Sequence, residues 1–282
     1  MGRDGLMPAD RQRLAAARSL LFVPGSRPDR FEKAAEAGAD VVVLDLEDAV
    51  RPDEKELALQ HVVEWLASGR WAVVRINGIG TPWHEAEISA LAPIGCGVMV
   101  PKAEDANALA GLAEHWECGL VALVETARGV QVLDAVAAAP GVERIALGTI
   151  DLAAELGVDP ASWPALAYAR GRVVAASSAA KLPAPIDGVT TAVADAKRLT
   201  SDALAARELG FGGKLCIHPR QVQAIHQAFH PRAEEISWAK RVVAASSAGG
   251  VTVVDGAMID APVVRRARAI LSRVDSAAEP VM

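Results

Sequence analysis

Residues 119–129 read Gly-Leu-Val-Ala-Leu-Val-Glu-Thr-Ala-Arg-Gly and contain the clearest strand-to-helix junction of the chain. The apolar run has the length of a strand, it ends at Glu125, and a helical pattern begins at Thr126. A continuous apolar run without alternation is typical of a strand that is buried on both faces of a parallel sheet. The sequence therefore predicts a lone carboxylate, Glu125, at the C-terminal end of a buried strand.

The next apolar run along the chain ends in the same way. Residues 148–151 read Gly-Thr-Ile-Asp, so Asp151 places a second carboxylate at the end of the neighbouring strand. Mg2+ typically takes only one or two protein carboxylates and fills its other positions with water and substrate. We therefore predict that Glu125 and Asp151 bind Mg2+ and, with it, the substrate. The alternative is that both carboxylates satisfy backbone amides, with Asp151 as the N-cap of a helix.

Strand-like runs alternate with helical segments from residue 19 to residue 230. The eight runs are Ser19–Val23, Asp40–Leu46, Trp71–Ile76, Gly97–Val100, Gly119–Val124, Arg144–Thr149, Pro185–Val189 and Lys214–Ile217. Eight such units predict an α/β fold of the (β/α)8 TIM-barrel type, and the polar residues at the strand ends lie where that fold places active sites. An open doubly wound sheet is the second choice, because the first strand-to-helix turn lacks the Gly-x-Gly-x-x-Gly fingerprint.

The barrel leaves both ends of the chain to be explained. We expect residues 1–18 to be a frayed N-terminal lead-in, residues 19–230 to form the barrel, and residues 231–282 to form a C-terminal extension. The extension has helical patterns at its two ends, and Val253–Asp260 between them resembles a β-hairpin. Its role is either to cap the barrel or to act as a lid or subunit contact.

Composition narrows the classes of partner. The 282 residues include 29 basic and 35 acidic ones, a net charge of −6 with no basic block, which argues against nucleic acid and anionic membranes. The apolar runs are far shorter than the ~20 residues of a membrane span, and the N-terminus has no signal-peptide pattern. We therefore expect a cytoplasmic protein. Cys96, Cys118 and Cys216 lack metal-type spacing and are expected to be buried thiols.

A cluster of acids closes the second strand-like run. Residues 44–50 read Leu-Asp-Leu-Glu-Asp-Ala-Val, and strand alternation would point Asp45 and Glu47 in the same direction. Two converging acids repel each other unless a proton, a cation or an arginine lies between them. Arg75 ends the third run and is costly to bury without an anion. It is either the internal partner of Glu47 or the clamp for a substrate carboxylate, and both roles are compatible.

Two further sites have two readings each. Arg27, Arg30 and Lys33 make the first strand-to-helix connection basic, which suits either a solvated face or contact with a cofactor phosphate. His218 precedes a proline at the end of the last run, where it is either a general base or a hydrogen-bonded structural residue.

Taken together, these motifs resemble the family of the citrate lyase beta subunit, within the wider group of Mg2+-dependent aldolases and malyl-CoA or citramalyl-CoA lyases. The resemblance runs from about Arg18 to Arg273. It rests on residues 18–25 (RSLLFVPG), 44–50 (LDLEDAV), 75–77 (RIN), 101–102 (PK), 124–126 (VET), 148–152 (GTIDL), 217–219 (IHP) and 255–260 (DGAMID).

The resemblance implies an oligomeric barrel, commonly a homotrimer or hexamer, with Mg2+ held by Glu125 and Asp151. It also implies that Arg75 binds the carboxylate of a 2-oxo or hydroxy acid near Glu47 and Asp48. The activity implied is Mg2+-dependent cleavage or formation of a carbon–carbon bond in a 3-hydroxyacyl-CoA thioester such as malyl-CoA, citramalyl-CoA or citryl-CoA.

Coenzyme A would then be part of the substrate. In family members that act on free CoA thioesters, a carboxylate of the C-terminal segment reaches a neighbouring subunit's site, and Asp260 matches it here. We expect Asp260 to handle the proton at the thioester carbon, with Arg75, Glu47 and Asp48 as the other catalytic residues. The family often has lysine before Met258, where this chain has alanine.

Two other functions compete with a stand-alone lyase. One is the beta subunit of a multi-component citrate lyase, acting on a thioester held by an acyl-carrier partner. The other is a catalytically silent scaffold, which is disfavoured because every expected metal and carboxylate-binding position is filled.

Overall fold

The computed structural model describes residues 8–115, 119–246 and 252–275. The chain divides into two compact units between Ala228 and Phe229, and each is described by itself.

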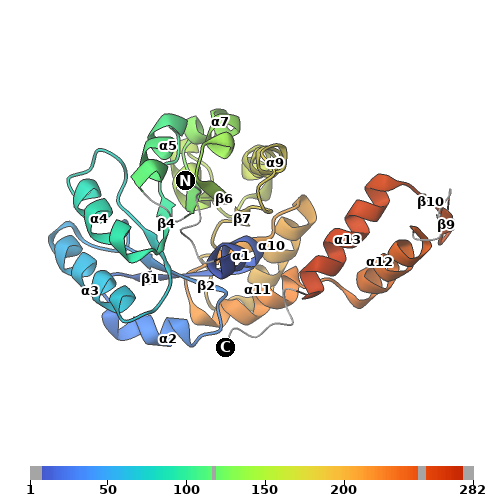
Figure 1. Ribbon diagram of the computed structural model, residues 1–282, viewed down its shortest axis with the longest axis horizontal. Helices are drawn as coiled ribbons and strands as arrows, with labels where there is room; N and C mark the ends of the chain where they lie inside the picture. Colours follow the sequence, from blue (N-terminus) through green and yellow to red (C-terminus); the bar gives the residue numbers. More distant parts are fainter. Residues whose placement is uncertain (1–7, 116–118, 247–251, 276–282) are drawn as a thin grey trace. The chain divides into compact units, whose positions relative to one another are not determined.

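The first unit is a closed barrel of eight parallel strands in chain order, with β8 pairing back onto β1 (Figure 1). The strands are β1 (Ser19–Pro24), β2 (Val41–Asp45), β3 (Val73–Arg75), β4 (Gly97–Val100), β5 (Leu120–Val124), β6 (Val142–Leu147), β7 (Ile186–Asp187) and β8 (Gly213–Cys216). The predicted (β/α)8 barrel is therefore confirmed.

Helices connect successive strands, as expected for parallel neighbours. In chain order they are η1 (Pro28–Arg30), α2 (Phe31–Ala35), η2 (Pro52–Glu54), α3 (Lys55–Ala67), α4 (His84–Leu91), η3 (Ala92–Ile94), α5 (Ala106–His115), α6 (Ala127–Gln131), α7 (Leu133–Ala138), α8 (Thr149–Leu156), α9 (Trp163–Ala179), α10 (Ala196–Leu209), η4 (Pro219–Gln221) and α11 (Val222–Phe229). The helical pattern that begins at Thr126 is divided into two helices, because the backbone of Val132 leaves the helical region and separates α6 from α7.

The N-terminal stretch differs from the expected frayed lead-in. Residues 8–16 form helix α1 (Pro8–Ala16), and Leu14 and Ala17 are buried in the same apolar cluster as the barrel strands. Arg144 on β6 anchors this stretch, because its guanidinium donates hydrogen bonds to the carbonyls of Leu14, Ala17 and Ala184. Full burial lowers the pKa of Arg144 to about 9.

The cysteine prediction holds where it can be examined. Cys96 and Cys216 are buried, and burial raises the pKa of the Cys216 thiol to about 12. Cys118 lies outside the described residues. Among the described residues, no helix has the length and apolarity that crossing a membrane requires.

The second unit contains α12 (Ala233–Ser246), the antiparallel strands β9 (Thr252–Val254) and β10 (Ala257–Ile259), and α13 (Ala261–Asp275). The hairpin predicted at this point is confirmed. Asp255 and Gly256 form the turn of this hairpin, with φ of 52° and 79°. Positive φ at both central residues is the geometry of the two-residue turns that match the twist of paired strands. Ala239, Val242, Ala267 and Ile270 form the core of this unit.

A polar cluster joins β1 to the start of β2 and to α11. The Asp40 carboxylate accepts hydrogen bonds from the backbone N–H groups of Arg18 (2.7 Å) and Ser19 (3.0 Å), and it lies 3.1 Å from His226 Nε2. Burial alone would raise the pKa of Asp40, but His226 and the two amides hold it at about 2, below its ordinary value of 3.8.

We predict that Asp40→Asn lowers the free energy of unfolding at pH 7 by about 2 kcal/mol, since a pKa difference of one unit is worth about 1.4 kcal/mol. Because folding lowers the pKa of Asp40, its carboxylate stabilises the fold at pH values above its ordinary pKa of 3.8. This contribution is lost as the pH falls toward about 2. Urea unfolding at pH 7, 5 and 3 should show the gap between wild type and variant narrowing with acidity. Asp53→Asn, at an exposed ion pair with Arg51, is the matched control. A gap that is independent of pH would contradict the assignment.

Candidate active site

A cavity of about 340 Å3 lies at the C-terminal ends of the barrel strands, and we call it the mouth cavity. Its lining brings together four of the residues predicted from the sequence, Asp48, Arg75, Glu125 and Asp151. The complete lining is Phe22, Asp45, Asp48, Ala49, Arg75, Leu123, Glu125, Gly148, Thr149, Ile150, Asp151, Val189, Leu215 and Ile217. These side chains come from distant parts of the sequence and meet because parallel strands end at one face of the barrel.

Glu125 follows β5 directly and is 2% exposed. Its Oε1 accepts a hydrogen bond from the backbone N–H of Lys102 at 2.9 Å. Burial, together with the charges of Glu47 and Asp151, raises the pKa of Glu125 to about 8 against the opposing Lys102 hydrogen bond. On the other side lies Gly148, where an added Cβ would stand 2.6 Å from Oε2. The missing side chain of Gly148 therefore leaves space beside this carboxylate.

Asp151 is placed differently from the prediction. The strand ends at Leu147 and α8 begins at Thr149, so Asp151 lies in the first turn of the helix and not at a strand tip. The N-cap is Gly148, so the N-cap alternative for Asp151 is wrong. A carboxylate in a first helical turn is stabilised by the helix dipole, and the half-buried Asp151 still lines the mouth cavity.

The chemistry of these donors fits Mg2+. Two carboxylates share one cavity, where burial and the charges of Glu47 and Asp151 raise the pKa of Glu125. No cluster of three or more His, Cys, Asp or Glu side chains suited to a metal occurs in residues 8–115, 119–246 and 252–275. Two carboxylates are as many protein ligands as Mg2+ usually takes, whereas structural zinc takes four. The assignment of Glu125 and Asp151 as ligands stays a prediction.

Arg75 ends β3 and forms the centre of the acidic cluster. Its Nε and Nη2 donate to the two oxygens of Asp45, both at 2.7 Å, while Nη1 lies 3.0 Å from Glu47 Oε2 and 3.5 Å from Asp48 Oδ2. The guanidinium also lies 5.0 Å from the centre of the Phe22 ring, at cation–π distance. The predicted pairing of Arg75 with Glu47 is thus present, and the bidentate partner is Asp45.

Asp45 was not among the predicted site residues, although it belongs to the acidic motif. It is 2% exposed, and its carboxylate also accepts hydrogen bonds from the N–H groups of Glu47 and Ala49. Asp45 therefore fixes both Arg75 and the turn that follows β2. Strand alternation pointed Asp45 and Glu47 the same way, but it did not say which of them would hold the arginine.

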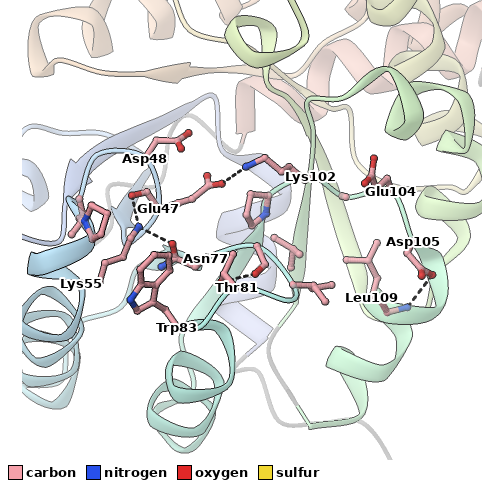
Figure 2. A pocket seen from close by; sticks show the side chains of 18 residues that line it. Glu47, Asp48, Lys55, Asn77, Thr81, Trp83, Lys102, Glu104, Asp105 and Leu109 are labelled. Atoms are coloured by element: carbon pink, nitrogen blue, oxygen red, sulfur yellow. Dashed lines mark hydrogen bonds and ion pairs between the residues drawn. The ribbon is translucent and has the colours of Figure 1, made fainter. Parts of the chain in front are cut away.

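A second cavity of about 610 Å3, which we call the side cavity, lies beside the acidic cluster (Figure 2). Glu47 and Lys102 stand at its edge: Lys102 Nζ donates to Glu47 Oε1 at 2.8 Å. Burial raises the pKa of Glu47 above its ordinary value, although Arg75 and Lys102 oppose the rise. Lys102 was quoted as part of a motif in the sequence, but no role followed from it.

The base of the side cavity contains a buried network that sequence reasoning missed. Lys55 at the start of α3 donates to the carbonyls of Leu46 (2.7 Å) and Glu47 (2.8 Å) and to Asn77 Oδ1 (2.7 Å) (Figure 2). Asn77 in turn donates its backbone N–H to Glu87 at 2.7 Å, and burial raises the pKa of Glu87 to about 7. This network holds the backbone that carries Glu47. Asn77 belongs to a quoted motif, whereas Lys55 and Glu87 look like ordinary charged helix residues.

The remaining predicted residues lie elsewhere. Arg27 precedes η1, Arg30 ends η1 and Lys33 lies on α2. All three are exposed, and Arg27 makes a bidentate ion pair with Asp29 at 2.9 Å. Their contact with a cofactor phosphate stays a prediction.

His218 takes a structural role in the described structure, because its Nδ1 accepts the Arg220 N–H at 3.1 Å as the cap of η4. Asp260 lies in the second unit, where its Oδ1 accepts the Val263 N–H at 3.1 Å at the start of α13. Its predicted catalytic role is not tested by this contact.

Comparison with known proteins places the chain in context. The sequence is 38% identical over 271 residues to a "citrate lyase subunit beta-like protein" of Mycobacterium tuberculosis, covering 93% of this chain and 97% of the relative. It is 35% identical to a "(3S)-malyl-CoA thioesterase" of Cereibacter sphaeroides over 93% of this chain and 95% of the relative. It is 30% identical to an "L-malyl-CoA/beta-methylmalyl-CoA lyase" of Rhodobacter capsulatus, over 92% and 95% of the two chains.

Among solved structures, the fold matches the protein CitE of Mycobacterium tuberculosis in complex with magnesium, acetoacetate and coenzyme A. The TM-score is 0.81 at 35% identity, and the match covers 93% of this chain and 99% of that one. Residues 18–219 match the family described as HpcH/HpaI aldolase/citrate lyase. The chain therefore belongs to the HpcH/HpaI aldolase/citrate lyase family.

Proposed function

We propose that the protein is a Mg2+-dependent carbon–carbon lyase that acts on a 3-hydroxyacyl-CoA thioester such as malyl-CoA, citramalyl-CoA or citryl-CoA. Cleavage would give a 2-oxo acid and an acyl-CoA, and the reverse direction would join them. The observation that carries the proposal is the meeting of Glu125, Asp151 and Arg75 in the mouth cavity. Relatives named as a malyl-CoA lyase and as CitE with magnesium, acetoacetate and coenzyme A support it.

Each residue has a role that its contacts suit. When bound by Glu125 and Asp151, Mg2+ would supply Lewis acidity at the oxygen of the cleaving carbon. Arg75 would bind the substrate carboxylate, because Asp45 holds its guanidinium rigidly at the edge of the mouth cavity. Glu47 and Asp48 would keep Arg75 oriented through Nη1.

The thioester end of the substrate needs further groups. Asp260 would deliver the proton to the thioester α-carbon, as a carboxylate from the C-terminal segment of a neighbouring subunit in a homo-oligomer such as a trimer. Arg27, Arg30 and Lys33 would contact the phosphates of coenzyme A, since exposed basic side chains next to a strand end suit that charge.

One alternative rests on a specific observation. A relative with 35% identity is named a malyl-CoA thioesterase, so hydrolysis of the thioester is the second candidate reaction. An acyl-carrier-bound thioester, as in a multi-component citrate lyase, would be the substrate if free CoA thioesters are not cleaved.

The deciding experiment is turnover of the purified protein on malyl-CoA, citramalyl-CoA and citryl-CoA with Mg2+, with EDTA as control. Chromatography of the products separates the reactions, because a lyase gives acyl-CoA and a 2-oxo acid whereas a thioesterase gives free coenzyme A and a hydroxy acid. Cleavage of no thioester in the panel would contradict the stand-alone lyase.

We predict that Glu125→Ala or Asp151→Ala lowers Mg2+-dependent kcat at least about 100-fold, because each removes charge that the metal requires. Circular dichroism should show an unchanged fold. The control is Asp159→Ala, which should keep full activity. Asp159 is exposed, and its carboxylate accepts a hydrogen bond only from the nearby Ala161 N–H among the contacts described. Unchanged turnover in either site variant would remove these residues from the metal site.

Asp260 allows its structural and chemical roles to be separated. Asparagine is as good an N-cap as aspartate, so Asp260→Asn should keep the start of α13 while removing the proton-handling carboxylate. We predict a fall in kcat of about 100-fold with a change in KM below about 3-fold. Asp255→Asn on the same hairpin is the control. A pure rise in KM would make Asp260 a binding residue instead.

A further inference from the structure

The roles proposed so far leave Lys102 unexplained. It follows β4 after Pro101 and has φ of 49°, a left-handed backbone that a side-chain-bearing residue seldom adopts. Such conformations are retained mainly where surrounding contacts enforce them, often at functional sites. Here the backbone N–H of Lys102 donates to Glu125 Oε1 at 2.9 Å, so its position is tied to that of a predicted metal ligand.

The ammonium of Lys102 is paired with Glu47, and the Lys102 side chain is still accessible to solvent. Its Nζ lies 2.8 Å from Glu47 Oε1, and the Lys102 side chain is 51% exposed whereas that of Glu47 is 7% exposed. An ammonium has three N–H donors, and Figure 2 shows this group reaching toward Glu47 at the edge of the side cavity.

The charges around the side cavity define what it can hold. Asp48, Glu104 and Asp105 line it in addition to the paired Glu47, so an anion that does not reach the Lys102 ammonium is disfavoured. Of the two lysines in its lining, Lys55 uses its donors on two carbonyls and Asn77, which leaves Lys102 with donors to offer.

The remaining residues that line the side cavity suit an uncharged part of a substrate. Trp83, Ile79 and Leu109 supply apolar surface, and the volume of about 610 Å3 exceeds that of the mouth cavity. Glu47 stands between the two cavities, with Oε1 on Lys102 and Oε2 on Arg75, and Asp48 lines both. A substrate whose acid end meets Arg75 would therefore place its neutral thioester end toward Lys102.

We propose that Lys102 is a further catalytic residue, which donates a hydrogen bond to the carbonyl oxygen of the acyl thioester in the side cavity and stabilises the enolate formed on cleavage. This inference rests on the proposed lyase function. Solvent takes the proton of the substrate hydroxyl, the electron pair of that oxygen forms the carbonyl of the 2-oxo acid, and the electron pair of the breaking carbon–carbon bond moves to the α-carbon and thioester oxygen. Asp260, the proton donor proposed above, then protonates the α-carbon to give the acyl thioester and regains its proton from solvent, and Lys102 keeps its own proton throughout.

The first test is Lys102→Met, which removes the charge and keeps much of the side-chain stem. Loss of one donor to a developing oxyanion typically costs about 100-fold or more in kcat, and KM should change less than about 3-fold. Lys102→Arg should recover most of the loss. Lys181→Met is the matched control, because Lys181 is an exposed lysine that also has a left-handed backbone, with φ of 59°.

A binding measurement separates charge stabilisation from structure. Carboxymethyl-CoA carries a negative charge one bond beyond the position of the enolate oxygen, whereas acetyl-CoA is neutral in this region. Calorimetry should show that Lys102→Met weakens carboxymethyl-CoA binding about 100-fold and acetyl-CoA binding less than about 3-fold, as expected for a residue that favours the transition state.

The outcomes distinguish the two proposals. A wild-type protein that cleaves the thioesters while Lys102→Met is equally active overturns this inference alone. Equal loss of affinity for both CoA ligands in Lys102→Met also overturns it, because it indicates a structural effect. A wild-type protein that neither cleaves the thioesters nor binds either ligand overturns the lyase function and this inference with it.

Discussion

The bidentate ion pair between Arg75 and Asp45 is the interaction on which the candidate site depends. Asp45 and Glu47 are almost fully buried, at 2% and 5% exposure, and without the guanidinium their charges would repel in a poorly solvated place. Removing one partner of a buried ion pair typically costs about 3–5 kcal/mol. The pair also fixes the ends of β2 and β3 relative to each other, so that Asp45 and Arg75 line the same cavity.

The site nevertheless keeps an excess of negative charge. Arg75 and Lys102 face Asp45, Glu47, Asp48, Glu125 and Asp151. Burial raises the pKa values of both Glu47 and Glu125, and the charges of Glu47 and Asp151 add to the rise at Glu125. A divalent cation would offset the excess of negative charge. The close placement of these carboxylates destabilises the protein without a metal, but it suits metal-dependent chemistry.

Sequence reasoning found the barrel and part of the site for physical reasons. Buried strands appear in the sequence as continuous apolar runs, so a polar residue at the C-terminal end of such a run is easily recognised. Glu125 and Arg75 were found in this way. Asp151 was found but misplaced, because the early start of α8 after Gly148 leaves little local signal. Lys55 and Glu87 were missed because a charged residue in a helix looks the same in sequence whether it faces water or a buried partner. Helix α1 was missed for a similar reason, since Leu14 gains its burial only from the closed barrel.

The left-handed backbone of Lys102 has an evolutionary consequence. Such a conformation costs a residue with a side chain about 1–2 kcal/mol, and glycine would relieve the strain while leaving the N–H donor to Glu125 in place. Stability and the chemistry proposed for the ammonium therefore favour different residues at one position. Laboratory selection for heat resistance alone would drive this position toward glycine, and only selection for turnover would hold the lysine, a local trade-off between stability and activity.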